Sequence, residues 1–369
     1  MTVQVREVQA NEPAPPPAPS VTAHRGWLPL AIMLGVGALA AMFAFTDVRE
    51  IGHVISQADP WLLAIPLACT IASYIVMALS YQGIAHAAGA VVPFREMLKI
   101  TFVANTANYL VATGGLSGFA LRLYFFTRRA IPSGTAVVIS LAQGYITNVT
   151  LLAFVLFGFG YLVTFHNLSG WALVATSILL ALFSATAVVT LLLLGHRRLR
   201  RRTLFILANT THWLLHHLMP RRKPGRMRIW RFQRNLNRGI EFMLARKTHM
   251  VMPTLYIFVD WIVTLAILDG AFVALRYNIP FNFVVVGFAI GVTLSLISFI
   301  PGGLGIMEGS MAAVFASLGV PFETAVVAVL IFRVAYYVLP LVISLFFFHG
   351  MFLQGAHLRP ELRDMKLPE

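Results

Sequence analysis

Two pairs of adjacent glycines interrupt apolar stretches of the sequence, TGGLSG at residues 113–118 and PGGLGI at residues 301–306. A helix broken at such a pair inside a bilayer exposes backbone N–H and C=O groups, which are costly unless protein, water or ligand supplies partners. The first turn of a following helix also offers N–H groups and partial positive charge to an anion such as phosphate. The breaks therefore predict a polar binding site, with a tightly packed helical hairpin as the structural alternative. The glycines concerned are Gly114, Gly115, Gly302 and Gly303.

Ionisable residues lie close to both breaks. Arg122 follows the first break, Glu308 follows the second, and Arg333 falls within a later apolar run. Each such group costs roughly 2.5–3.5 kcal/mol at the centre of a membrane helix, so it is expected to face a cavity or a partner. Glu308 lies about 7.5 Å along a helix from the second break. A Glu308–Arg333 pair is therefore expected, and both a substrate-binding and a purely structural role stay open.

Two acids interrupt another apolar run, at Asp260 and Asp269. They are half a helical turn out of phase, so they do not form a two-carboxylate site. Asp260 is expected to face the bundle interior and to join the binding site. Asp269 is expected near the outer interface together with Arg276.

The composition is that of an integral membrane protein. Of 369 residues, 58% are hydrophobic and only 11% are charged, and the mean hydropathy is +0.78. Apolar runs long enough to span a bilayer are expected to form transmembrane helices, with two shorter pieces beside the glycine breaks. The expected spans are about 27–46, 60–84, 133–163, 170–195, 250–275 and 322–348, the shorter pieces are 97–112 and 304–318, and the role of 281–299 is left open.

The excess positive charge lies in one segment, residues 196–249, because the rest of the chain holds equal numbers of basic and acidic residues. Short loops rich in Lys and Arg stay cytoplasmic. Basic residues recur at helical spacing from Arg228 to Arg238, which predicts an amphipathic helix on anionic head groups at the inner membrane surface. Nucleic-acid binding is the less favoured alternative. Three histidines, His212, His216 and His217, are interpreted as interfacial because no acid or cysteine supports a metal site.

An internal repeat relates the two breaks. Their glycine pairs are 188 residues apart, and TAVV recurs at 135–138 and 324–327, an offset of 189. If the first break forms a re-entrant hairpin, three spans follow before the second copy, which then enters from the opposite side. The fold predicted is an all-α, polytopic membrane bundle of about six spans plus two re-entrant hairpins, in an inverted internal repeat.

Catalytic signatures are sparse. The sequence holds no GxxxxGK[ST], HExxH or GxSxG motif, and the single Cys69 forms no internal disulfide. No catalytic residue, cofactor or metal is expected.

The sequence around the breaks resembles the lysylphosphatidylglycerol synthase membrane-region family of flippase-like proteins. The similarity covers about residues 25–350. The more specific motif is PGGLGIMEGSMAAVFASLGVPFETAVVAVLIFRVAYYVLP at 301–340, and the first is TGGLSGFALRLYFFTRRAIPSGTAVV at 113–138, closest to the multiple-peptide-resistance type. The resemblance implies two re-entrant hairpins around a lipid-accessible cavity, and movement of a phospholipid or lipid-linked molecule between leaflets.

By position, Gly302, Gly303, Glu308 and Arg333 match the family's second motif, and Gly114, Gly115 and Arg122 match its first. The first motif departs from many relatives, which carry an acid where this chain has Ser117 and Gly118. Many relatives also have an arginine in the next span, where Gln143 and Gly144 stand here. The chain ends without a soluble aminoacyl-transfer domain, so it is not expected to act as an enzyme by itself.

The function expected is translocation of a phospholipid or lipid-linked anionic molecule between leaflets. A transporter of a small polar solute and a membrane scaffold that recruits a cytoplasmic enzyme are the alternatives. Expected partners are the lipid substrate and anionic head groups at the basic segment, without nucleic acid, and a homo-oligomer stays open. The location expected is the bacterial inner membrane, with both termini cytoplasmic. The organisation expected is a disordered tail at 1–25, a membrane half at 26–195, a basic linker at 196–249, a membrane half at 250–350 and a cytoplasmic tail at 351–369.

Overall fold

The regular structure is entirely helical within the residues that the computed structural model describes, which confirms the all-α prediction. The described residues are 48–110, 116–129, 131–165, 170–196, 198, 202, 247–298 and 300–347. Five helices in this part of the chain are long and apolar enough to cross a membrane: Ala64–Ala87, Ser133–Phe165, Thr248–Ala274, Phe281–Ser298 and Phe322–Phe347. The protein is therefore a multi-pass membrane protein.

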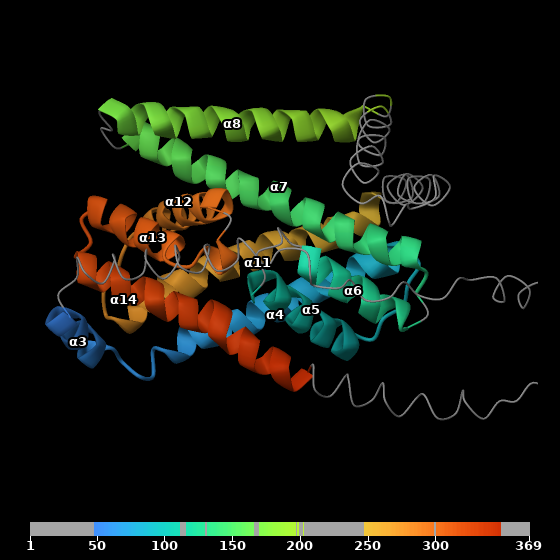
Figure 1. Cartoon of the computed structure of the whole chain (residues 1–369), viewed down its shortest axis with the longest axis horizontal. Coiled ribbons are helices and arrows are strands. Elements are labelled where there is room, and N and C mark those ends of the chain that lie inside the picture. The colour runs from blue at the N-terminus through green and yellow to red at the C-terminus, as the bar shows by residue number, and fades with distance from the viewer. Residues whose placement is uncertain are drawn as a thin grey trace, which may run out of the picture.

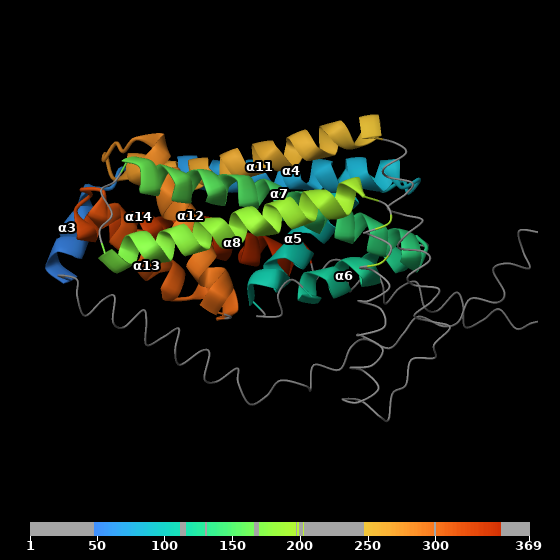
Figure 2. The ribbon, with the colours of Figure 1, turned by 90° about the horizontal axis from the view of Figure 1, so that it is seen from above.

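The helices are numbered along the chain in Figure 1. The first half contains α3 (Val48–Gln57), α4 (Ala64–Ala87), α5 (Phe94–Leu110), α6 (Leu116–Thr127), α7 (Ser133–Phe165) and α8 (Gly170–Gly195). The second contains α11 (Lys247–Ala274), α12 (Phe281–Ser298), the short turn η1 (Pro301–Gly303), α13 (Ile306–Ser317), α14 (Phe322–Arg333) and the π-helical turn η2 (Val334–Val338), which continues as helix to Phe347. Helix α8 packs on α7 and forms the outermost layer on that side (Figures 1 and 2). The span expected at 27–46 and the amphipathic helix and histidines expected in the basic linker lie outside the described residues.

Each glycine break joins the two arms of a helical hairpin. Helix α5 has 17 residues and is followed by the 12-residue α6, while α12 has 18 residues and is followed by the 12-residue α13. The arms of each hairpin pack on one another. Segment 281–298, whose role the sequence left open, packs against α13 as the first arm of the second hairpin and is also long and apolar enough to cross a membrane. The α5–α6 and α12–α13 hairpins lie toward opposite ends of the long axis of the bundle (Figure 1).

Helices α4 and α11 form an antiparallel pair with reciprocal contacts. A methyl group at Gly83 would lie 2.8 Å from Pro253 Cγ, and one at Gly270 would lie 3.4 Å from Pro66 Cδ. Each helix therefore places a glycine against the proline of the other. Both prolines and both glycines are separated by 187 residues, close to the offsets of 188 and 189 between the sequence motifs.

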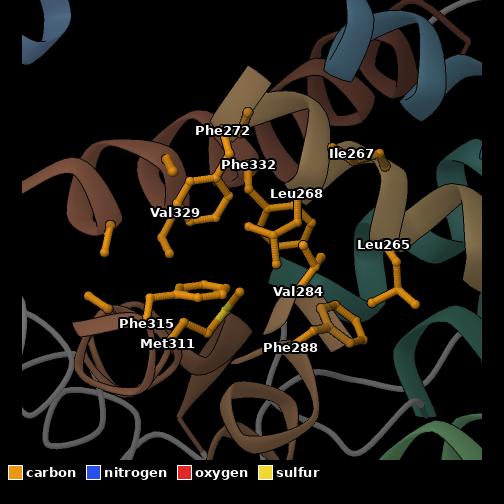
Figure 3. Close-up of a cluster of buried hydrophobic side chains, with 14 of the residues drawn as sticks. Leu265, Ile267, Leu268, Phe272, Val284, Phe288, Met311, Phe315, Val329 and Phe332 are labelled. Carbon is orange, nitrogen blue, oxygen red and sulfur yellow. The ribbon is translucent and has the colours of Figure 1, made fainter. Parts of the chain in front are cut away.

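The apolar core of the second half lies between α11, α12, α13 and α14 (Figure 3). Phe272 of α11 meets Phe315 of α13 edge to face, with ring centroids 4.9 Å apart, and Phe288 of α12 meets Phe332 of α14 at 6.2 Å. Such aromatic pairs stabilise beyond the area that they bury. This core fixes the hairpin against α14, which carries Arg333.

The two ends of the bundle differ in charge. At the linker end, where α4 ends and α11 begins, the described cations include Arg95, Lys99, Arg128, Arg129 and Lys247. Glu96 at this end forms ion pairs with one lysine and one arginine of that group. This asymmetry bears on the orientation in the membrane.

The opposite end, called the far end here, carries a single ion pair between loops among the described residues. Arg276 donates a hydrogen bond to Asp59 Oδ2 at 3.1 Å, and the Asp59 N–H donates to Ala274 O at 2.9 Å. The loop between α3 and α4 thus supplies the partner of Arg276, which the sequence had associated only with Asp269. The hydrogen bond from Arg276 holds the pKa of Asp59 below its ordinary value.

Candidate functional site

The second glycine break has a backbone that only glycine adopts easily. Gly302 and Gly303 have φ values of +62° and +63°, and Gly305 has +80°, all in the left-handed region where a Cβ atom is strained. A methyl group at Gly302 would also lie 3.2 Å from the carbonyl oxygen of Tyr109 in α5. The turn therefore takes the Gly302 and Gly303 carbonyls out of regular helical hydrogen bonding and brings Gly302 against α5 of the first half.

Arg333 supplies those missing partners. Its Nη1 donates to Gly302 O at 2.8 Å, and its Nη2 donates to Gly303 O at 3.2 Å. Because both carbonyls belong to the break, the arginine of α14 stabilises the turn between α12 and α13. The sequence placed Arg333 near this break but did not show that it binds the backbone there.

The expected Glu308–Arg333 pair is present. Arg333 Nε lies 2.7 Å from Glu308 Oε1, and the two side chains are only 9% and 3% exposed. The contact is an ion pair that lacks the alignment of a hydrogen bond, and Glu308 Oε2 is buried without a hydrogen-bond partner. Glu308 thus neutralises the arginine and keeps one acceptor oxygen unused.

Aromatic residues connect this centre to the first hairpin. The Arg333 guanidinium lies over the ring of Tyr337, 4.3 Å from its centroid, a cation–π contact. The hydroxyls of Tyr109 in α5 and Tyr336 in η2 are 2.9 Å apart and share a hydrogen bond. The π-helical turn that carries Tyr336 and Tyr337 directly follows Arg333, and such turns are frequent at functional sites. These three tyrosines were missed by sequence reasoning; the Tyr336–Tyr337 pair within an apolar run was the available signal.

Arg122 lies on α6, the second arm of the first hairpin. Its Nη2 donates to Asn105 Oδ1 at 2.7 Å, and its guanidinium lies 4.8 Å from the ring centroid of Tyr81. The side chain is 6% exposed, and its Nε is buried without a hydrogen-bond partner. Arg333 Nε also lacks a hydrogen bond but lies 2.7 Å from Glu308 Oε1, whereas Arg122 forms no ion pair with a carboxylate of the described residues. Gly114 and Gly115, the predicted glycines of this break, lie outside the described residues.

Asp260 faces the interior, as expected, at the contact of α11 with α4. Ser73 of α4 donates a hydrogen bond to Asp260 Oδ1 at 2.5 Å, and Asp260 is 5% exposed. Within the described part of the chain no lysine or arginine forms an ion pair with it. Sequence periodicity gave no means of pairing it with Ser73, 187 residues away.

Further polar contacts line the same interior. The hydroxyls of Thr106 in α5 and Ser344 beyond η2 are 2.7 Å apart. Gln143 of α7 accepts a hydrogen bond from Ser80 at 2.9 Å. This is the part of α7 in which many relatives were expected to carry an arginine. The structure thus buries Arg122, Asp260, Glu308 and Arg333, with hydroxyl and amide groups from both halves, in the interior of the bundle, called the buried polar region here.

The fold and this polar interior define a helical membrane protein in which two broken-helix hairpins enclose buried charged groups. The chain belongs to a known family of this class. Residues 27–344 match the family described as the lysylphosphatidylglycerol synthase TM region, which confirms the resemblance seen in the sequence.

Curated relatives carry the name phosphatidylglycerol lysyltransferase. The protein of Staphylococcus haemolyticus (strain JCSC1435) is 21% identical over 324 residues, which cover 85% of this chain and 33% of the relative. The protein of Staphylococcus aureus (strain MRSA252) is 34% identical over 92 residues, covering 25% of this chain and 11% of the relative. The chain therefore spans about a third of the length of the first of these relatives, and the match covers the membrane region of the family.

Proposed function

We propose that this protein moves a phospholipid or a lipid-linked anionic molecule between the two leaflets of a membrane. The head group would cross through the buried polar region while the acyl chains stay in the bilayer. The observation that carries the proposal is the meeting of the second glycine break with the first hairpin, at Gly302 and Tyr109, beside buried arginines. Family membership supports a lipid-handling role. Transport by the membrane region, rather than lysyl transfer, is the activity proposed for this chain.

An inverted repeat would supply the two-sided access that transport requires. Broken helices related by such a repeat meet at substrate sites in many transporters. The opposite placement of the two hairpins (Figure 1) and the reciprocal Gly83–Pro253 and Gly270–Pro66 contacts support this arrangement. The two membrane halves, 26–195 and 250–350, are proposed as its two copies.

The orientation proposed places the linker end in the cytoplasm. Its surplus of Lys and Arg among the described residues, together with the basic linker 196–249, supports this side by the positive-inside rule. Anionic head groups are the proposed partners of that linker. The far end, with Asp59 and Arg276, would then face outward.

Arg333 and Arg122 are proposed to have different roles in transport. Arg333 contacts two glycine carbonyls, the Glu308 carboxylate and an aromatic ring, so its proposed role is to stabilise the conformation of the second break. Arg122 is buried and forms no ion pair with a carboxylate of the described residues, and guanidinium is suited to phosphate oxygens. Arg122 is therefore proposed as the first ligand of the head-group phosphate.

The test is movement of a fluorescent phosphatidylglycerol between leaflets in vesicles containing the purified protein. Arg122→Ala should abolish movement, and Arg122→Lys should restore part of it because lysine keeps the charge but lacks the planar fork. Arg128→Ala is the matched control, since Arg128 is exposed and lies over Tyr124 at the linker end. Wild-type vesicles that show no movement above protein-free vesicles, with or without a proton gradient, would contradict the proposal.

A further inference from the structure

We propose that Asp260 is a proton-binding site through which a proton gradient drives the relative movement of the two halves of this protein. The inference rests on the proposed transport function and adds its energy source. It concerns a carboxyl group that lies at the contact between α4 and α11.

Asp260 contacts the residue that occupies the equivalent position on the other helix. Ser73 and Asp260 are 187 residues apart, the same separation as Pro66 from Pro253 and Gly83 from Gly270. The two residues thus occupy equivalent places on the two helices, and they contact one another. In an antiparallel pair, a contact between equivalent positions lies on the local two-fold axis. The Ser73–Asp260 hydrogen bond is therefore a direct link between the two halves.

The surroundings of Asp260 favour its neutral form. Its partner is the Ser73 hydroxyl, and the two buried arginines, Arg122 and Arg333, are engaged with Asn105 and Glu308. An ionised carboxylate without a paired cation is unstable in such an interior.

The titratable groups that face Asp260 from the neighbouring elements are tyrosines. Helices α7 and α12 contain no Asp, Glu, Lys or Arg, and the charged residues of α14 are Glu323 and Arg333, of which Arg333 is paired with Glu308. Phenols, which are neutral near pH 7, cannot balance a carboxylate charge. The tyrosines are Tyr74 and Tyr81 of α4, Tyr109 of α5 and Tyr336 of η2.

Ionisation of Asp260 would therefore require a different packing of α4 on α11. The O–H bond of the neutral acid breaks, its electron pair stays on the carboxylate oxygen, and the proton passes to water that enters the contact. The protonated form stabilises the closed packing described here, and the ionised form stabilises a packing open to water. A ligand, here the proton, shifts such an equilibrium by its different affinity for the two states. A proton gradient across the membrane then biases the direction of movement.

The first experiment measures the proton directly. Infrared difference spectra of the purified protein in lipid nanodiscs should show the carbonyl band of a buried protonated carboxyl group near neutral pH. Asp260→Asn should remove this band, and Ser73→Ala should shift it by removing the hydrogen bond. Asp269→Asn is the matched control on the same helix and should leave the band in place. A band that survives in Asp260→Asn, or no band in the wild type, overturns the inference.

The second experiment measures coupling in vesicles. Wild-type lipid movement should change rate with an imposed pH gradient, and Asp260→Asn should lose that dependence while it keeps its folded yield. Retained gradient dependence in Asp260→Asn also overturns the inference. A wild-type protein that shows the infrared band but moves no lipid would instead contradict the proposed function alone, so the two failures are distinguishable.

Discussion

Replacing Glu308 and replacing Arg333 should lower the free energy of unfolding by different amounts. Glu308→Gln removes the counter-charge, but Arg333 keeps two glycine carbonyls and the Tyr337 ring. Removal of one partner of a buried pair typically costs about 3–5 kcal/mol, so we expect a loss near the lower limit, about 3 kcal/mol. Arg333→Gln leaves a buried carboxylate together with two carbonyls that have lost their donors. We expect its loss near the upper limit, about 5 kcal/mol.

The double variant should be less damaging than the sum of the single ones. With both charges gone, no uncompensated ion remains in the interior, and the two glutamine side chains can bond with each other. We expect a total loss of about 5–6 kcal/mol and hence a coupling energy of about 2–3 kcal/mol, within the range for residues in contact.

The assay is the free energy of unfolding in mixed micelles, followed by circular dichroism as a denaturing detergent is added. The matched control is the exposed Asp59–Arg276 pair, whose arginine side chain is 71% exposed; its cycle should show a much smaller coupling because solvent screens the charges. Losses at Glu308 and Arg333 that add within about 0.5 kcal/mol would refute the reasoning, since they would mean that the two side chains do not share one environment.

Three further predictions concern the break, the orientation and the far end. Gly303→Ala should lower folded yield sharply, because φ is +63° and the new methyl group would overlap the Ser295 side chain, while Gly309→Ala, with open space around it, should fold normally; equal yields would argue against the left-handed conformation of the turn. Trp61 and Val91 are both more than 80% exposed. On a background without the native cysteine, Trp61→Cys should react with an impermeant maleimide from outside, and Val91→Cys only from inside. The reverse pattern would mean that the orientation is opposite to the proposed one. The pKa of Asp59 is lower in the folded than in the unfolded protein. Its contribution to stability should therefore be complete above the unfolded pKa of about 3.9 and should disappear as the pH falls through the lower folded pKa. If the free energies of unfolding of wild type and Asp59→Asn differ by a constant amount across this pH range, the ion pair does not contribute in this way.

Apolar run length was sufficient to predict most of the helices. The expected spans 133–163 and 250–275 correspond to Ser133–Phe165 and Lys247–Ala274, because a charge-free run of this length has few alternatives to a membrane helix. The role of 281–299 could not be decided in this way. An arm of a hairpin and a full span have the same composition, and the packing of α13 on α12 could not be read from the sequence.

The candidate site could be predicted where its residues lie close to a motif in the sequence, or where a charged residue in an apolar run is costly in free energy. Glu308 and Arg333 were paired correctly, because each is expensive in an apolar run and one follows the break. Ser73 and Tyr109 were missed because a single hydroxyl in an apolar helix is common and carries no sign of its distant partner. The contact of Arg333 with the glycine carbonyls was also beyond the sequence, since it depends on the path of the turn.

The hydrogen bonds that join α5 to the last helix also set a condition on biosynthesis. Tyr109 bonds to a residue 227 positions later, and Thr106 to one 238 positions later. At about 5–20 residues per second, a ribosome needs about 10–50 s to produce those partners after α5 has been made. During that interval the first hairpin has polar side chains in or near the membrane that its own half does not satisfy. A nascent chain halted before α14 should therefore be held by an insertase or degraded, and the membrane domain is expected to complete its interior only after its last helix has been inserted.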